Sequence, residues 1–144
     1  MYFRIVPDKI SQAQNAIDLL NFKLAENRPV YEEILRFYSD GALIESNIAD
    51  LKELLLHKEI KVYKASAKSF EDCVYDLLNN YPITAAKGML RYYEAGNFEW
   101  PECEKAEIIM GDALAQDIYG WKPDSWTVFK KEGEGVNLTA IVAV

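Results

Sequence analysis

The sequence has few of the residues that build metal and nucleophilic sites, with two cysteines and one histidine in 144 residues. Cys73 and Cys103 are far apart and form no CxxC pair, and His57 stands alone after a run of leucines. Zinc sites need several such ligands at short spacing, and a disulfide framework needs more cysteines. The sequence therefore predicts no metal site, and it favours buried free thiols in a reducing compartment.

Long hydrophobic runs and phosphate-binding loops are also missing. No stretch approaches the 18 or more apolar residues of a membrane span, and the segment before Pro7 is too short for the hydrophobic part of a signal peptide. No GxxxxGK or GxGxxG motif follows a predicted strand, so we expect no nucleotide cofactor. The acidic segment 132–135 is too short for a calcium loop. These absences predict a cytoplasmic protein without a cofactor.

Negative charge is what the sequence has in excess. The formal net charge is -7, from 23 acidic and 16 basic residues. Phosphate backbones and anionic membranes repel such a chain, so we expect no direct binding to nucleic acid or membranes. A protein partner with a basic surface is compatible with this charge. A plainer interpretation is that the acidity only keeps the chain in solution.

Hydrophobic periodicity predicts a single α+β domain over residues 1–144. Apolar residues at three- and four-residue steps, with capping residues before them, predict about six helices. Alternation and β-branched residues predict about four strands in a small, mainly antiparallel sheet, with a C-terminal hairpin around the turn at 132–135. The helices are expected over about 11–26, 29–40, 46–57, 69–78, 84–96 and 101–119, and the strands over 2–6, 60–65, 126–131 and 136–143.

The negative charge is concentrated between residues 94 and 117, where seven acidic residues accompany one base, Lys105. Aromatic residues lie just before this segment, within it and just after it. They are Tyr92, Tyr93, Phe98, Trp100, Tyr119, Trp121 and Trp126. Aromatic side chains are favoured in the cores of protein interfaces. The residues that we expect to contact a basic partner are Glu99, Trp100, Glu102, Glu104 and Glu107.

Two observations limit this expectation. Most of the aromatic residues are needed to fill the interior. On a helical projection, Glu104 and Glu107 share one side of the last predicted helix, whereas Asp112 lies on the opposite edge. The same helix has apolar residues on two faces, which predicts packing on more than one side. Such packing limits the number of acidic side chains that the helix can expose to a partner.

A set of polar residues defines a candidate pocket. They are Arg91, Tyr92, Tyr93 and Asp117. The projection places Asp117 among apolar residues, where a carboxylate needs hydrogen-bond donors. We favour a structural role for it, such as accepting from a tryptophan N–H, over a catalytic one.

The leading functional hypothesis is a non-enzymatic protein-binding domain, similar in composition to small acidic inhibitors, immunity proteins and phage-encoded blockers of nucleic-acid enzymes. This comparison covers no motif. The first alternative is a small enzyme or small-molecule binder that uses the candidate pocket. The second is an oligomeric structural subunit that assembles through the edge of the C-terminal hairpin. The partner, the oligomeric state and the strand order are left open by the sequence.

Overall fold

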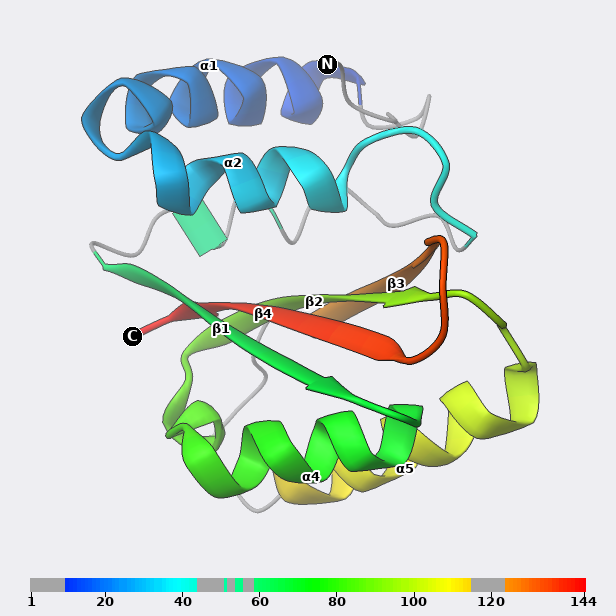
Figure 1. Cartoon of the computed structure of the whole chain (residues 1–144). Helices are drawn as coiled ribbons and strands as arrows, with labels where there is room; N and C mark the ends of the chain where they lie inside the picture. The colour runs from blue at the N-terminus through cyan, green and yellow to red at the C-terminus, as the bar shows by residue number, and fades with distance from the viewer. Residues whose placement is uncertain (1–9, 44–50, 52–53, 56–58, 115–123) are drawn as a thin grey trace.

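One four-stranded sheet lies between two layers of helices in the computed structural model (Figure 1). The structure describes residues 10–43, 51, 54–55, 59–114 and 124–144. Helix α2 (Arg28–Phe37) lies over one face of the sheet, and α1 (Ile10–Glu26) packs against α2. Helices α4 (Phe70–Asn80) and α5 (Trp100–Leu114) cover the other. The predicted α+β class is confirmed.

The sheet is mixed, with its strands in the order β1-β4-β2-β3. The strands are β1 (Ile60–Ala67), β2 (Gly88–Ala95), β3 (Asp124–Lys130) and β4 (Val136–Ala143). Strand β4 pairs antiparallel with both β1 and β2, whereas β3 lies parallel to β2. The predicted C-terminal hairpin is therefore wrong, because β2 lies between the two strands that were expected to pair.

The connection from β3 to β4 contains the glycines typical of a hairpin turn, but it crosses over β2, which lies between the two strands. Gly133 and Gly135 adopt φ angles of +83° and +88°, which side chains other than glycine rarely tolerate. The backbone passes so close over the end of β2 that a Cβ on Gly96 would lie 1.9 Å from the carbonyl oxygen of Gly133. Glycines in a short connection mark a reversal of the chain, but they do not fix which strand lies next to which.

The predicted helix over 84–96 is also wrong, because this segment contains a short 3₁₀ turn (η2, Ile83–Ala85) followed by β2. Seven of the eight residues of β2 are buried, and Glu94 is the exception. A strand with helices on both faces carries a nearly continuous apolar run instead of an alternating one. Such a run also satisfies helical spacing, so periodicity alone cannot separate the two structures.

Four α-helices lie wholly within the described residues, and the predicted number of six is too high because residues 88–95 form a strand. The predicted strand over 2–6 lies outside those residues. Of the predicted helix over 46–57, the structure describes Leu51, Leu54 and Leu55, which are helical and buried. No helix in the described ranges is both long and apolar enough to cross a membrane.

The oligomer hypothesis assumed that the C-terminal hairpin supplies a free sheet edge. Strand β4 is instead an inner strand with a neighbour on each side. Strand β3 is an edge strand, but its outer side is partly occupied, since Leu43 N–H donates to the Val128 carbonyl at 2.7 Å and Ala42 bridges Phe129. The C-terminal strands therefore offer less free edge than the sequence suggested.

Candidate functional site

The pleat of β2 divides the candidate pocket between two faces of the sheet. Tyr93 packs in the core beneath α4 and α5, and Arg91 lies on the same face. Tyr92 packs in the opposite core, where its hydroxyl donates to a carboxylate oxygen of Glu33 on α2. Asp117 lies outside the described residues. The structure thus brings together two of the four predicted pocket residues and separates a third from them.

Arg91 is the largest fully buried side chain among the described residues, with 1% of its surface exposed. Its Nη2 donates to Glu107 of α5, and its Nη1 donates to Asp124 at the start of β3. Burial disfavours the charge on Arg91, but these two carboxylates outweigh that effect and raise its pKa. The three side chains form an ion-pair network that links α5, β2 and β3.

Tyr93 completes this network by donating its hydroxyl to the second carboxylate oxygen of Glu107. Burial, reinforced by the charge of Glu107, raises the pKa of the tyrosine well above its usual range. Glu107 therefore holds one residue with each of its two oxygens, and its side chain is only 12% exposed. It was predicted as a partner-binding residue, but the structure places it beneath α5, against the sheet.

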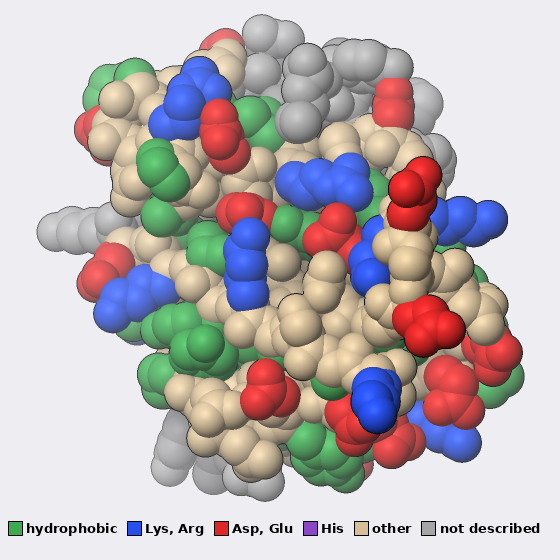
Figure 2. Space-filling model, viewed as in Figure 1, with side chains coloured by type: hydrophobic (Ala, Val, Ile, Leu, Met, Phe, Trp, Pro, Cys, Tyr) green, Lys and Arg blue, Asp and Glu red, His purple; other side chains and the backbone are tan. Residues whose placement is uncertain are grey.

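The acidic excess lies mainly on one helical layer. Helices α4 and α5 together contain seven acidic residues and one base, whereas α1 and α2 contain four acids and three bases. We call the outward surface of α4 and α5 the acidic face. Its carboxylates are Asp72 and Asp76 on α4 and Glu102, Glu104 and Asp112 on α5. In Figure 2, several acidic side chains lie close together at the lower right of the molecule, and others are spread over its upper half.

Three large hydrophobic side chains are exposed on α4 and α5: Tyr75, Trp100 and Ile108. Trp100 is 51% exposed, and its ring lies 6.1 Å from both Trp126 and Phe98, measured between centroids. These contacts restrain the indole while leaving about half of the side chain open to solvent. An aromatic residue held in this way loses little freedom on binding, which favours it as an anchor.

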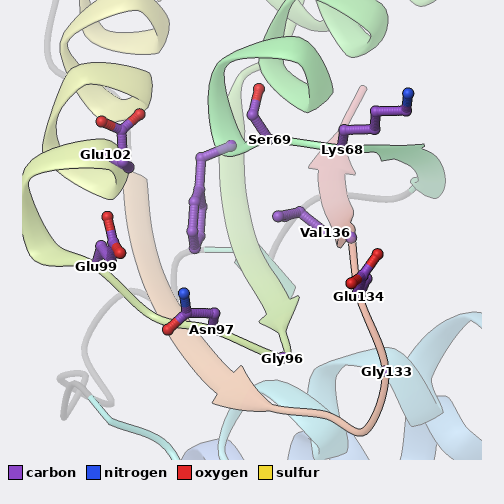
Figure 3. Close-up of a pocket in the computed structure, with 11 residues that line it drawn as sticks. Lys68, Ser69, Gly96, Asn97, Glu99, Glu102, Gly133, Glu134 and Val136 are labelled. Atoms are coloured by element: carbon purple, nitrogen blue, oxygen red, sulfur yellow. The ribbon is translucent and has the colours of Figure 1, made fainter.

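A cavity of about 450 Å³ lies beside the acidic face, where β1, β2 and β3 end and where α4 and α5 begin (Figure 3). Glu99 and Glu102 stand on one side of it, and Glu134 of the β3–β4 connection stands on the other. Lys68 extends away from Glu99 and Glu102. The remaining lining consists of Ser69, Phe70, Gly96, Asn97, Gly133, Gly135 and Val136.

The predicted partner-binding residues therefore occupy three environments. Glu99 and Glu102 line the cavity, Trp100 and Glu104 are exposed on α5, and Glu107 belongs to the buried network. Sequence reasoning missed Asp124 and Glu134. No local signal marks Asp124 as the partner of Arg91, and Glu134 was interpreted only as part of a hairpin tip.

Both cysteines are free and buried, as the sequence indicated. The Cys73 thiol donates to the Val136 carbonyl at 3.0 Å. Burial raises the pKa of Cys73 to about 11 and that of Cys103 to about 12, with Glu107 adding to the second shift. Neither thiol is therefore ionised near neutral pH, and neither has the character of a nucleophile.

This environment predicts very slow thiol chemistry in the native protein. At pH 8, we expect a disulfide reagent such as DTNB to modify both cysteines at least about a thousandfold more slowly than in denaturant, because modification requires unfolding. The folded-state pKa values exceed those of the unfolded chain, so stability should also fall as pH rises above about 9. Rapid modification of either cysteine under native conditions would contradict the burial.

Comparisons with known proteins bear on the fold alone. No protein-family model matches the chain, and no curated protein matches it. Among solved structures, an FtsZ dimer from M. jannaschii matches with a TM-score of 0.64 at 15% identity, over 85% of this chain and 38% of that one. A tryptophan-to-tyrosine variant of M. jannaschii FtsZ matches equally well and is covered to 40%. The chain therefore spans about two fifths of the proteins whose fold it shares in part.

Proposed function

We propose that this chain is a non-enzymatic protein-binding domain that captures a basic partner on its acidic face, as an acidic inhibitor or blocker would. The observation that carries the proposal is the asymmetry of charge between the two helical layers. Acidity needed only for solubility would not have to gather on one layer, whereas α4 and α5 carry six acidic residues besides the inward-facing Glu107, and only one base. A one-sided charge of this kind orients and accelerates the encounter with an oppositely charged surface.

The mechanism that we propose has two parts. The carboxylates steer a basic surface towards α4 and α5, and the exposed rings of Trp100 and Tyr75 supply apolar contact once it arrives. The bound domain would then cover the partner's nucleic-acid or substrate site and block it by steric exclusion. We place this activity in the cytoplasm, where two free buried cysteines would stay reduced.

The proposal predicts that capture of the partner depends on the acidic face and on salt. The protein would be immobilised and used to capture proteins from the lysate of its host, beside a variant carrying Glu102→Lys and Glu104→Lys. We expect the variant to capture the partner at least about tenfold less well, because two attractive charges become repulsive. Capture by the wild-type protein should also fall steeply between about 50 mM and 500 mM salt, as the screening length shortens.

A matched control tests whether capture of the partner depends on where the charges lie or only on the net charge. Asp18→Lys with Glu26→Lys changes the net charge by the same amount, but on exposed positions of α1 in the opposite layer. This variant should capture the partner nearly as well as the wild-type protein. Equal losses in both variants would mean that only net charge matters, and capture that is insensitive to salt would remove the electrostatic mechanism.

A further inference from the structure

We propose that the outer edge of β1 pairs, antiparallel, with β1 of a second copy of this chain, so that the sheet continues from one molecule into the other. This inference does not depend on the proposed function. All eight residues of β1 pair with β4 in one unbroken register. Strand β1 ends the sheet, and Figure 1 shows it at the front of the molecule, with α2 above it and α4 below it. An edge strand of this length is a ready template for another strand.

The backbone groups of β1 point alternately towards β4 and towards the open side. The Val144 N–H donates to the Glu59 carbonyl at 3.0 Å, and these two residues continue the register of β1 and β4. Residues that bond to one neighbour alternate along an antiparallel strand with residues that face away from it. The outward-facing residues are Ile60, Val62, Lys64 and Ser66. Within the part of the chain that the structure describes, their backbone groups have no hydrogen-bond partner, in contrast to the outer side of β3.

Charge often protects an edge strand from pairing, and in β1 that charge is offset. Its two lysines are exposed, but Lys64 donates to Glu33 of α2 at 3.0 Å, and the Lys61 ammonium lies 3.7 Å from Glu59. Each lysine therefore has a carboxylate of its own chain beside it. Two such edges can approach each other without the repulsion that unpaired lysines would cause.

The order of side chains along β1 favours one register for two copies. Outward-facing residues must lie opposite one another, so a two-fold axis passes through a single residue position. A centre at Lys61 or at Lys64 would set two lysines directly opposite each other, which is destabilising. A centre at Tyr63 pairs residues 60–66 of both copies, whereas a centre at Val62 pairs only 60–64. The centre at Tyr63 therefore gives the longest pairing without opposed lysines.

This register also brings complementary side chains together on both faces of the sheet. On the α2 face, Lys64 of each copy lies opposite Val62 of the other, and the two lysines are diagonal neighbours that the Glu33 carboxylates of both copies can share. On the α4 face, the two Tyr63 rings meet, and each is already stacked on Tyr81 at a centroid distance of 4.7 Å. Aromatic pairs and opposite charges across strands stabilise a sheet, and two-fold dimers are the commonest symmetric assembly.

Sedimentation equilibrium of the full chain tests the assembly between about 5 and 500 µM, since a small interface is expected to bind in the micromolar range. The mass should rise from 16.5 kDa towards twice that value. Lys64→Pro should weaken the dimer at least about tenfold, because each copy loses an outward N–H donor while the ladder to β4 is kept. Lys64→Ala keeps the N–H and should dimerise within about threefold of the wild-type protein. A constant mass of 16.5 kDa would overturn the proposal.

Cysteine variants test the register even if the proline disturbs folding. The two residues at the centre lie at a position without ladder hydrogen bonds, with Cα atoms about 4.5 Å apart, which a disulfide can bridge. Oxidised glutathione should therefore join two Tyr63→Cys chains, and it is itself reduced to two thiols. The control Lys61→Cys is on the same face and more exposed. Its two copies lie four residues apart along the ladder, roughly 13 Å, so it should link at least about tenfold more slowly. Faster linking at position 61, or a dimer that neither variant links, would overturn the register.

Salt distinguishes this edge from the acidic face. Each copy carries a net charge of -7, so screening their repulsion should leave the dimer unchanged or strengthen it between about 50 mM and 500 mM salt. Capture of a basic partner should weaken over the same range. A dimer that is lost at high salt, and also in the variant with Glu102→Lys and Glu104→Lys, would assign the contact to the acidic face and overturn the pairing of β1.

Discussion

Replacing Arg91 with methionine is expected to lower the free energy of unfolding by about 3–5 kcal/mol, the usual loss when one member of a buried ion pair is removed. The guanidinium is 1% exposed and is held by Glu107 and Asp124. Without it, Glu107 keeps only the hydroxyl of Tyr93 as a donor, at 12% exposure. Urea unfolding followed by circular dichroism would measure the loss, which should appear as a lower midpoint at unchanged slope.

Two further variants test whether the buried network is the cause. Arg28→Met removes an arginine from an exposed pair with Glu32, and it should change stability by less than about 1 kcal/mol. Arg91→Met combined with Glu107→Leu replaces the inner pair with apolar groups, and it should recover much of the loss, because no unpaired charge is left beneath α5. A loss for Arg28→Met as large as that for Arg91→Met would contradict the argument from burial.

The sequence predicted best where a structure depends on near neighbours. In α4, the spacing of Phe70, Cys73 and Leu77 indicated the helix, and all three are buried. The Ser69 hydroxyl caps this helix by accepting from the N–H of Asp72 at 3.1 Å. The apolar spacing and the capping residue each depend on residues within about one helical turn, so both can be recognised from the local sequence.

Predictions failed where the outcome depends on distant segments. Strand β2 lies between two helical layers, and only that environment explains its unbroken apolar run. The expected hairpin failed because β4 pairs with β1 and β2, from segments more than 40 residues earlier in the chain. The residues of the connection between β3 and β4 do not determine which strands β4 pairs with.

In the candidate site, too, the features set by the local sequence were predicted, and those that depend on distant segments were not. The acidic and aromatic character of the segment from Glu94 onwards is visible in the sequence, and the structure keeps Trp100 and Glu104 exposed. The inward orientation of Glu107 could not be predicted, because its partner Arg91 lies on a strand that periodicity assigned to a helix. The cavity was equally hidden, since its walls come from Glu99 and from Glu134, which are 35 residues apart.

Gly96→Ala is expected to lower the free energy of unfolding by about 3 kcal/mol, at the upper end of the usual cost of overpacking. The added Cβ would lie 1.9 Å from the Gly133 carbonyl oxygen and 3.1 Å from its carbon. These are backbone atoms, so no side-chain rotation can relieve the clash. The Lys131 N–H also donates to the Ala95 carbonyl at 3.1 Å, which ties the two connections together and resists their separation.

The same substitution at Gly111 should act in the opposite direction. Gly111 is exposed within α5, and a Cβ there would meet no atom within 4 Å. Alanine should therefore stabilise the protein by about 0.5–1 kcal/mol, because glycine is a poor helix former. Urea unfolding of both variants would compare one chemical change in two environments. A loss at Gly96 below about 1 kcal/mol would show that the β3–β4 connection can move away from β2 at little cost.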